Sequence, residues 1–321
     1  MANTYRIGSF NMYKYSANTH KNKEAISNII KNNNIDILAI QEIFSEQALK
    51  NLLGYLNEEH WAGSWASPNS KSASAAEGYA YIWNKDRISL SRNKSGKVFY
   101  PVIHNQYSYK DVNGISEKLI RNPFYGRFTL KSNEQIEIRL INTHIMFSKT
   151  RSINDSDDHD TSDDLPNDVN MRKREFSILA SGILPKIDNK DYDLRWNEQD
   201  TRLIRPYTIL LGDYNLNLKD SGAGYPYIEP LISWKDSITE KSIITIQNDK
   251  STLKARRADN PHIDGLKNNY DHFTYDENRP IQVNRCWAAD PMTDSSIPFD
   301  YDKYKDEISD HLMVIMEISF K

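Results

Sequence analysis

The chain has 321 residues, of which 38% are hydrophobic and 26% are charged, so it can bury a core and is not disordered as a whole. Its 41 Lys and Arg residues nearly balance its 44 Asp and Glu residues, and the net charge of −3 argues against a protein that coats nucleic acid. A single cysteine, Cys286, excludes an intramolecular disulfide and a cysteine-based zinc site.

The first residues have neither the basic nor the apolar region of a signal peptide. No stretch approaches the roughly 20 apolar residues that a membrane span needs. We therefore expect a cytoplasmic protein without a membrane span, with export by a signal-less route as the alternative. The sequence does not indicate an oligomeric state.

Hydrophobic periodicity predicts alternating strands and helices in the first part of the chain. In chain order these are strand 5–12, helix 23–32, strand 35–40, helix 45–56, a loop of small residues at 61–76, strand 77–83 and a polar, basic loop at 88–98. The first strand, helix and strand have the size and order of a βαβ-like unit.

The second part of the chain is predicted to be richer in strands. In chain order it contains strands 125–130 and 135–143, an exposed acidic loop at 151–168, helix 169–183, a polar insertion at 191–205, strand 208–211, a long loop, and strands 242–247, 270–275 and 312–318. Calcium binding through its aspartates is the alternative for the acidic loop. Since no repeat or linker divides the chain, we expect one α/β domain over residues 1–321.

The most informative stretch runs from 207 to 218. Residues 208–211 form a short apolar run, typical of a buried strand, and Gly212, Asp213, Tyr214 and Asn215 follow it directly. In a tight turn a carboxylate and an amide two residues apart can project to the same side, at a strand end where function often lies. The alternative is an ordinary turn, because Gly, Asp and Asn are turn residues.

Similar polar residues recur wherever apolar strands meet loops. They are Asn11, Glu42, Glu77, His144, Asp213, Asn215, Asp271, Asp310 and His311. If these strand ends gather at one edge, their oxygen-rich ligands suit hard cations such as magnesium, manganese or calcium. Two imidazoles beside a metal bound by carboxylates suit hydrolysis of a phosphate ester. Each residue taken alone also fits a structural role.

The residues around these positions form motifs in a fixed order. They are Ser9-Phe10-Asn11, Ile40-Gln41-Glu42, Glu77-Gly78-Tyr79-Ala80, Arg121-Asn122-Pro123-Phe124, Asn142-Thr143-His144, Gly212-Asp213-Tyr214-Asn215, Tyr270-Asp271-His272-Phe273 and Ser309-Asp310-His311. In this order they resemble the endonuclease/exonuclease/phosphatase superfamily, the deoxyribonuclease I-like proteins, over nearly the whole chain.

The resemblance implies a four-layer α/β sandwich, in which two packed mixed β-sheets are flanked by helices. It also implies a divalent-metal-dependent phosphodiesterase or phosphatase. Carried over to this chain, Glu42 would bind the metal ion, with Asn11 and Asp310 nearby. Mg²⁺ is the expected ion, with Mn²⁺ or Ca²⁺ as alternatives.

The resemblance further implies two histidine and carboxylate pairs around the scissile phosphate. His144 and His311 would flank the phosphate, Glu77 would hydrogen-bond His144, and Asp271 would hydrogen-bond His311. Each carboxylate would fix the tautomer of its imidazole and raise its basicity. The roles of acid and base stay open between the two histidines.

Three further residues complete the implied site. Asp213 and Asn215 would orient the attacking water or the phosphate, and Arg121 would contact the phosphate.

The motifs are most similar to those of the deoxyribonuclease I branch. The sequence has neither the Trp-Cys-Asp-Arg type motif of the phosphatase branch nor the Arg-Leu-Asp-Tyr type motif of abasic-site nucleases around Asp271. His272 departs from the branch, which often has arginine there. We expect an endonuclease with nucleic acid as partner, DNA rather than RNA.

Two alternatives remain. One is a phosphatase or phospholipase C-type hydrolase of inositol phosphates or sphingomyelin, for which segment 61–65 is the one candidate exposed apolar loop. The other is an inactive binding module, which the intact set of acids and histidines disfavours.

Basic side chains are candidate DNA contacts, because they would track phosphates and make binding dependent on salt. The candidates are Arg121, Arg127, the Arg172-Lys173-Arg174 cluster, Lys254, Arg256 and Arg257. The alternative is that they belong to ordinary solvated faces. Most of the Tyr and Trp residues are expected in the core.

Overall fold

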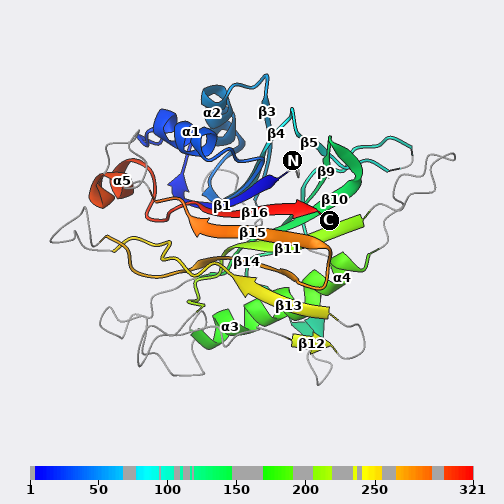
Figure 1. Ribbon diagram of the computed structural model, residues 1–321. Coiled ribbons are helices and arrows are strands. Elements are labelled where there is room, and N and C mark those ends of the chain that lie inside the picture. Colours follow the sequence, from blue (N-terminus) through cyan, green and yellow to red (C-terminus); the bar gives the residue numbers. More distant parts are fainter. Residues whose placement is uncertain are drawn as a thin grey trace.

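A computed structural model gives the arrangement of the chain (Figure 1). The residues that it describes are 4–67, 77–93, 95–104, 109–110, 116–117, 119–146, 169–190, 205–218, 234–236, 241–254, 265–290 and 300–320. The acidic segment 151–168, the insertion 191–204, and Arg256 and Arg257 lie outside these ranges.

The first sheet of the described residues has six strands. Their order across the sheet is β15 (Ile281–Ala288), β16 (Val314–Phe320), β1 (Tyr5–Tyr15), β2 (Ile37–Ile43), β4 (Gly78–Asn84) and β3 (Trp61–Ala66). β1 and β2 run parallel, and every other pair in this sheet is antiparallel. The sheet is therefore mixed.

The second sheet of the described residues is also mixed. Its order is β12 (Trp234–Asp236), β13 (Lys241–Ile246), β14 (Asp271–Asp276), β11 (Arg205–Asp213), β10 (Asn133–His144), β9 (Phe124–Leu130) and β5 (Ile88–Leu90), and β6 (Val102–Ile103) pairs with β9. Its parallel pair is β10 and β11. A separate short pair joins β7 (Tyr109–Lys110) and β8 (Ser116–Glu117).

Helices cover the outer face of each sheet (Figure 1). Helices α1 (Lys23–Asn32), α2 (Glu46–Leu56) and α5 (Tyr301–Glu307) pack on the first sheet, and α3 (Val169–Ser177), the π-helix η1 (Ile178–Ile183) and α4 (Leu184–Asp188) pack on the second. Each set of helices forms an apolar cluster with its own sheet, and the inner faces of the two sheets form another apolar cluster between them. The fold is thus a four-layer α/β sandwich, as predicted.

Local sequence explains the first two helices. Asn22 and Ser45 cap them, each side chain accepting a hydrogen bond from an amide of the first turn. Apolar residues then recur at helical spacing, such as Leu49, Leu52 and Leu53 in α2, and these side chains are buried against the first sheet.

A polar network joins the inner faces of the sheets. The Asn142 amide on β10 donates to the carbonyl oxygen of Ile40 on β2 at 3.0 Å and accepts from the amide of Gln41 at 2.7 Å. The Tyr81 hydroxyl on β4 accepts from the backbone N–H of Asn142 at 3.0 Å. Buried and bonded in this way, these groups fix the two sheets relative to each other next to the strand ends described below.

Most predicted elements are present with shifted ends, and three predictions are corrected. Segment 61–66 is strand β3 rather than loop, and Ile88–Leu90 is strand β5. The helix predicted at 169–183 changes to π-helical geometry at Ile178 and continues to Asp188. Strand β15 and helix α5 were not predicted.

The 61–65 segment is not an exposed apolar loop. The Trp61 side chain is 7% exposed, and the Trp65 indole N–H donates to the carbonyl oxygen of Ile43 at 2.9 Å. In the part of the chain that the structure describes, no helix is long and apolar enough to cross a membrane.

Candidate active site

The predicted site residues lie at one edge of the two sheets because of strand direction. Parallel strands β10 and β11 end in register, with His144 opposite Asp213, and antiparallel β14 begins with Asp271 opposite Asp213. In the other sheet, Asn11 and Glu42 lie toward the ends of the parallel strands β1 and β2. Residues from five of the eight motifs thus lie at this edge.

Gly212 makes the register at the centre possible. Its φ of +142° is one that side-chain-bearing residues rarely adopt, and a Cβ there would lie 1.9 Å from the carbonyl oxygen of Thr143 on β10. Only glycine lets β11 lie this close to β10, and Asp213 follows it directly. The glycine before Asp213 is therefore required by the close approach of the two strands.

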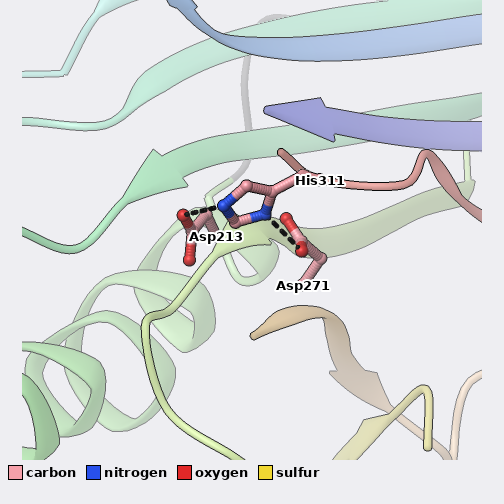
Figure 2. Close-up of side chains that lie close together, drawn as sticks. All are labelled: Asp213, Asp271 and His311. Atoms are coloured by element: carbon pink, nitrogen blue, oxygen red, sulfur yellow. Dashed lines mark hydrogen bonds and ion pairs between the residues drawn. The ribbon is translucent and has the colours of Figure 1, made fainter. Parts of the chain in front are cut away.

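Asp213 lies between two histidines. The Nε2 atoms of His144 and His311 are each 3.6 Å from the same Oδ2 atom of Asp213. Figure 2 shows the His311 ring between Asp213 and Asp271, with one ring nitrogen facing each carboxylate. This arrangement gives two imidazoles that converge on one carboxylate oxygen.

Each histidine has a second carboxylate on its other ring nitrogen. The His144 Nδ1 atom is 2.6 Å from Oε1 of Glu77, and the His311 Nδ1 atom is 2.8 Å from Oδ2 of Asp271. The Ser251 hydroxyl donates to the same Asp271 oxygen at 2.6 Å. A carboxylate on Nδ1 fixes the ring orientation and leaves Nε2 facing the site.

These carboxylates favour the protonated imidazoles. Burial alone would lower the pKa of His144, but the hydrogen bond to Glu77 and the charge of Asp213 raise it above its ordinary value. Burial opposes the same shift at His311, where Asp271 and Asp213 raise the pKa well above its ordinary value. The carboxylates therefore favour the protonated form of both rings, in which each Nε2 atom carries a proton.

A second acidic group lies beside Asp213. The Asn11 amide donates to Oδ2 of Asp213 at 3.0 Å and to Oε1 of Glu42 at 3.3 Å. Burial raises the pKa of Asp310, and the charges of Glu42 and Asp213 add to this against the opposing charge of His311. Oδ1 of Asp310 is buried without a hydrogen-bond partner among the described residues.

The oxygen atoms of this acidic cluster suit a hard cation as ligands. Crowded carboxylates and a buried carboxylate oxygen without a partner among the described residues form the oxygen-rich set that magnesium, manganese and calcium prefer. Next to them, one atom each of Asp213, Asp271 and His311 lie within 4.8 Å of one another, close enough to hold a metal ion. In that group both ring nitrogens of His311 already face carboxylates.

Unusual backbone surrounds the acidic group. Tyr13, Lys14 and Glu42 have φ values of 39°, 55° and 57°, and the β1–β2 register shifts between Asn11 and Tyr15. The backbone N–H of Lys14 donates to Oε2 of Glu42 at 3.0 Å. Left-handed residues other than glycine are costly and persist where surrounding contacts hold them, often at functional sites.

Lys21 supplies one of those contacts. Its side chain is buried, and its ammonium group donates to the carbonyl oxygens of Met12 at 2.6 Å and Tyr13 at 2.5 Å. Burial lowers the pKa of Lys21 to about 8, against the raising effect of the Asp310 and Glu42 carboxylates. A buried cation thus holds the irregular end of β1.

Arg121 lies in the site, but its guanidinium group contacts protein. Its Nη2 atom is 2.7 Å from Oε2 of Glu77, and its Nη1 atom is 2.9 Å from Nδ1 of His144. The backbone N–H of Asn215 donates to Oδ1 of Asp213 at 2.8 Å. Its side-chain amide donates to the carbonyl oxygen of Ile145 at 2.8 Å.

Two candidate DNA contacts are wrong. Arg127 is 3% exposed and pairs with Glu137 at 2.7 Å across β9 and β10. Arg172 is also 3% exposed and donates to the carbonyl oxygen of Asn215 at 2.7 Å. Neither guanidinium group can reach a nucleic-acid backbone in this structure.

No protein-family model matches the sequence, and no curated protein does. Solved structures match the fold. An endonuclease/exonuclease/phosphatase family protein from Bacteroides thetaiotaomicron is similar with a TM-score of 0.58 and 13% identity, covering 100% of this chain and 99% of its own. This chain has the endonuclease/exonuclease/phosphatase fold. A mannosyl-6-phosphatase from the same organism has a TM-score of 0.51 and 13% identity, covering 98% of this chain and 100% of its own.

A further structure with this fold is ANGEL2, described as a 2′,3′-cyclic phosphatase. It has a TM-score of 0.53 and 11% identity, covering 99% of this chain and 95% of its own.

Sequence reasoning missed several residues that hold the site together. Lys21 and Ser251 belong to no motif. The Ser309 hydroxyl donates to the carbonyl oxygen of Asn11 at 2.6 Å, and only its place in the Ser-Asp-His motif gave a signal.

Proposed function

We propose that this protein is a divalent-metal-dependent phosphodiesterase, a deoxyribonuclease I-like endonuclease that hydrolyses phosphodiester bonds of DNA. One observation carries the proposal: His144 and His311 each place Nε2 at 3.6 Å from one oxygen of Asp213, and each is backed by its own carboxylate. Two charged donors around one carboxylate suit an anionic phosphate that must be attacked by water.

In the proposed reaction the phosphate enters between the imidazoles. The carboxylates beside His144 and His311 raise the pKa of both rings and favour their protonated form, in which each Nε2–H donates a hydrogen bond to a phosphoryl oxygen or gives its proton to the departing oxygen. The Asp213 carboxylate orients the attacking water and accepts its proton. Glu77 and Asp271 hold the two rings in place.

Glu42 and Asp310 would hold the divalent ion, and Asn11, whose amide donates to Glu42 and Asp213, would hold these carboxylates in place beside it. Mg²⁺ is the ion we propose, and Mn²⁺ or Ca²⁺ would find the same oxygen ligands. When bound, the ion would offset the negative charge that develops on the phosphoryl oxygens.

The choice of DNA rests on the motifs around Glu77, Arg121 and Asp271, which resemble the deoxyribonuclease I branch. The phosphatase alternative stays open, because two of the structures with the same fold are described as a mannosyl-6-phosphatase and a 2′,3′-cyclic phosphatase. Those substrates share the phosphate that the site is proposed to bind and differ in the group attached to it.

A substrate panel tests the proposal. Purified protein is given supercoiled plasmid, single-stranded RNA, a sugar phosphate, a 2′,3′-cyclic nucleotide, an inositol phosphate and sphingomyelin, each with Mg²⁺, Mn²⁺, Ca²⁺ or a chelator. We expect nicking of the plasmid with Mg²⁺ and none with the chelator. Turnover of a phosphate monoester without nicking would assign the site to the phosphatase branch instead.

A further inference from the structure

We propose that helix α3 positions the candidate active site through Arg172 and Glu175, two buried charged residues one helical turn apart. The structural part of this inference stands on contacts alone, and its catalytic consequence rests on the proposed function. Their spacing of three residues puts both side chains on the same face of α3, and their burial shows that this face is turned toward the protein.

Arg172 holds the turn that follows Asp213. Its Nη1 atom donates to the carbonyl oxygen of Asn215 at 2.7 Å, and its side chain is 3% exposed. Asn215 has a left-handed φ of 50°, and its backbone N–H donates to Oδ1 of Asp213 at 2.8 Å. The guanidinium group therefore fixes the turn that orients the Asp213 carboxylate.

Glu175 holds the segment that carries Arg121. Its Oε1 atom accepts the backbone N–H of Ile120 at 2.5 Å, and its side chain is 3% exposed. Arg121 follows Ile120 and pairs with Glu77 at 2.7 Å, and Glu77 in turn pairs with Nδ1 of His144 at 2.6 Å. The Glu175 carboxylate therefore fixes the start of a chain of contacts that ends on the His144 ring.

The helix itself is anchored. Phe176 in α3 and the following residues Ile178 and Leu179 of η1 are buried in the apolar cluster beneath the second sheet. Because one rigid helix holds both charges, it also sets the distance between the Asp213 turn and the Arg121 segment. Buried charged groups with hydrogen-bond partners are costly to leave unsatisfied, so both contacts resist loosening.

Four variants test the inference. Arg172→Met removes the hydrogen-bond donor and Glu175→Met removes the acceptor. Arg172→Lys keeps a donor, and Glu175→Gln keeps an acceptor oxygen. The matched surface controls are Lys50→Met and Glu46→Gln in α2, an exposed ion pair outside the site. Each protein is assayed for kcat and KM on plasmid with Mg²⁺ and for hydrogen exchange of the peptides that contain Ile120 and Asn215.

We expect the two Met variants to lower kcat by about 10- to 100-fold with little change in KM, the usual effect of removing a group that orients a catalytic residue. The Lys and Gln variants should recover part of this loss, and the controls should match the wild type. Exchange should quicken in the two peptides and stay unchanged in the central strands.

Wild-type kcat and unchanged exchange in both Met variants would overturn the inference. A rise in KM alone that depends on salt would also overturn it, because that result indicates a phosphate contact. If a Met variant does not fold, the Lys and Gln variants carry the same test. If the wild type hydrolyses none of the substrates, the proposed function fails, while faster exchange at Ile120 and Asn215 in the variants would still support the positioning.

Discussion

Replacement of Gly212 by alanine tests the geometry at the centre of the site. The residue lies between the apolar run of β11 and Asp213, opposite Thr143 of β10. An added Cβ would lie 1.9 Å from the carbonyl oxygen of Thr143, whereas real Cβ contacts essentially never fall below 3.0 Å. The two strands would therefore have to move apart at the point where His144 and Asp213 are aligned.

The expected cost of Gly212→Ala has two parts. A residue other than glycine in such a sparsely populated backbone region costs about 1–3 kcal/mol. Forcing extra volume into a packed interior costs about 1–3 kcal/mol more, so the free energy of unfolding should fall by about 2–6 kcal/mol. Gly54→Ala is the matched control, because Gly54 lies in α2 with nothing within 4 Å of an added Cβ. There alanine should stabilise the protein by about 0.5–1 kcal/mol.

The assay is urea denaturation of both variants beside the wild type, followed by fluorescence and far-ultraviolet circular dichroism. A lower midpoint for Gly212→Ala and an equal or higher midpoint for Gly54→Ala are expected. A Gly212→Ala protein that keeps the wild-type midpoint and activity would refute the reasoning about the close approach of β10 and β11.

Three further predictions concern the residues around the site. Asp271→Asn should lower kcat by about 10- to 100-fold and move the alkaline limb of the pH–rate profile to lower pH, because His311 loses the carboxylate that raises its pKa; an unmoved limb would contradict this. In Lys21→Met the carbonyl oxygens of Met12 and Tyr13 lose their hydrogen-bond donor, so the free energy of unfolding should fall by about 1–3 kcal/mol. The Mg²⁺ concentration needed for half-maximal activity should rise. An unchanged Mg²⁺ requirement would show that Lys21 does not support the metal site. In the presence of chelator, His311→Gln should destabilise the protein most below about pH 6.5 and progressively less as the pH rises through the raised pKa of His311. Urea midpoints at several pH values measure this loss of stability. A loss that grows with pH would contradict the raised pKa of His311.

The periodic elements could be predicted from sequence because their apolar spacing is local. Strand β3 could not, since it contains Gly63 and Ser64 and lacks a strand-like alternation. The small residue is explained by packing: a Cβ at Gly63 would meet the Leu49 side chain of α2 at 3.1 Å. Helix α5 could not be predicted because its sequence is polar and lacks an apolar face, with only Tyr301 and Tyr304 buried.

The candidate site could be predicted as a set of residues, and its supports could not. Asn11, His144 and Asp213 stand at strand ends that the sequence shows, and parallel strands bring such ends to one edge. The sequence gives no sign that Arg127 is buried against Glu137 or that Arg172 holds a carbonyl group, because partners from distant parts of a fold decide whether a charge is exposed.

Plasmid nicking by histidine variants tests the central claim most directly. His144→Ala and His311→Ala are compared with the wild type and with His60→Ala, an exposed histidine paired with Asp86 outside the site. With Mg²⁺ we expect nicking by the wild type and His60→Ala, and nicking reduced on the order of 10²–10⁴-fold in the two site variants. With chelator we expect no nicking by any of the four proteins. Wild-type nicking by either site variant, or nicking that survives the chelator, would contradict the account.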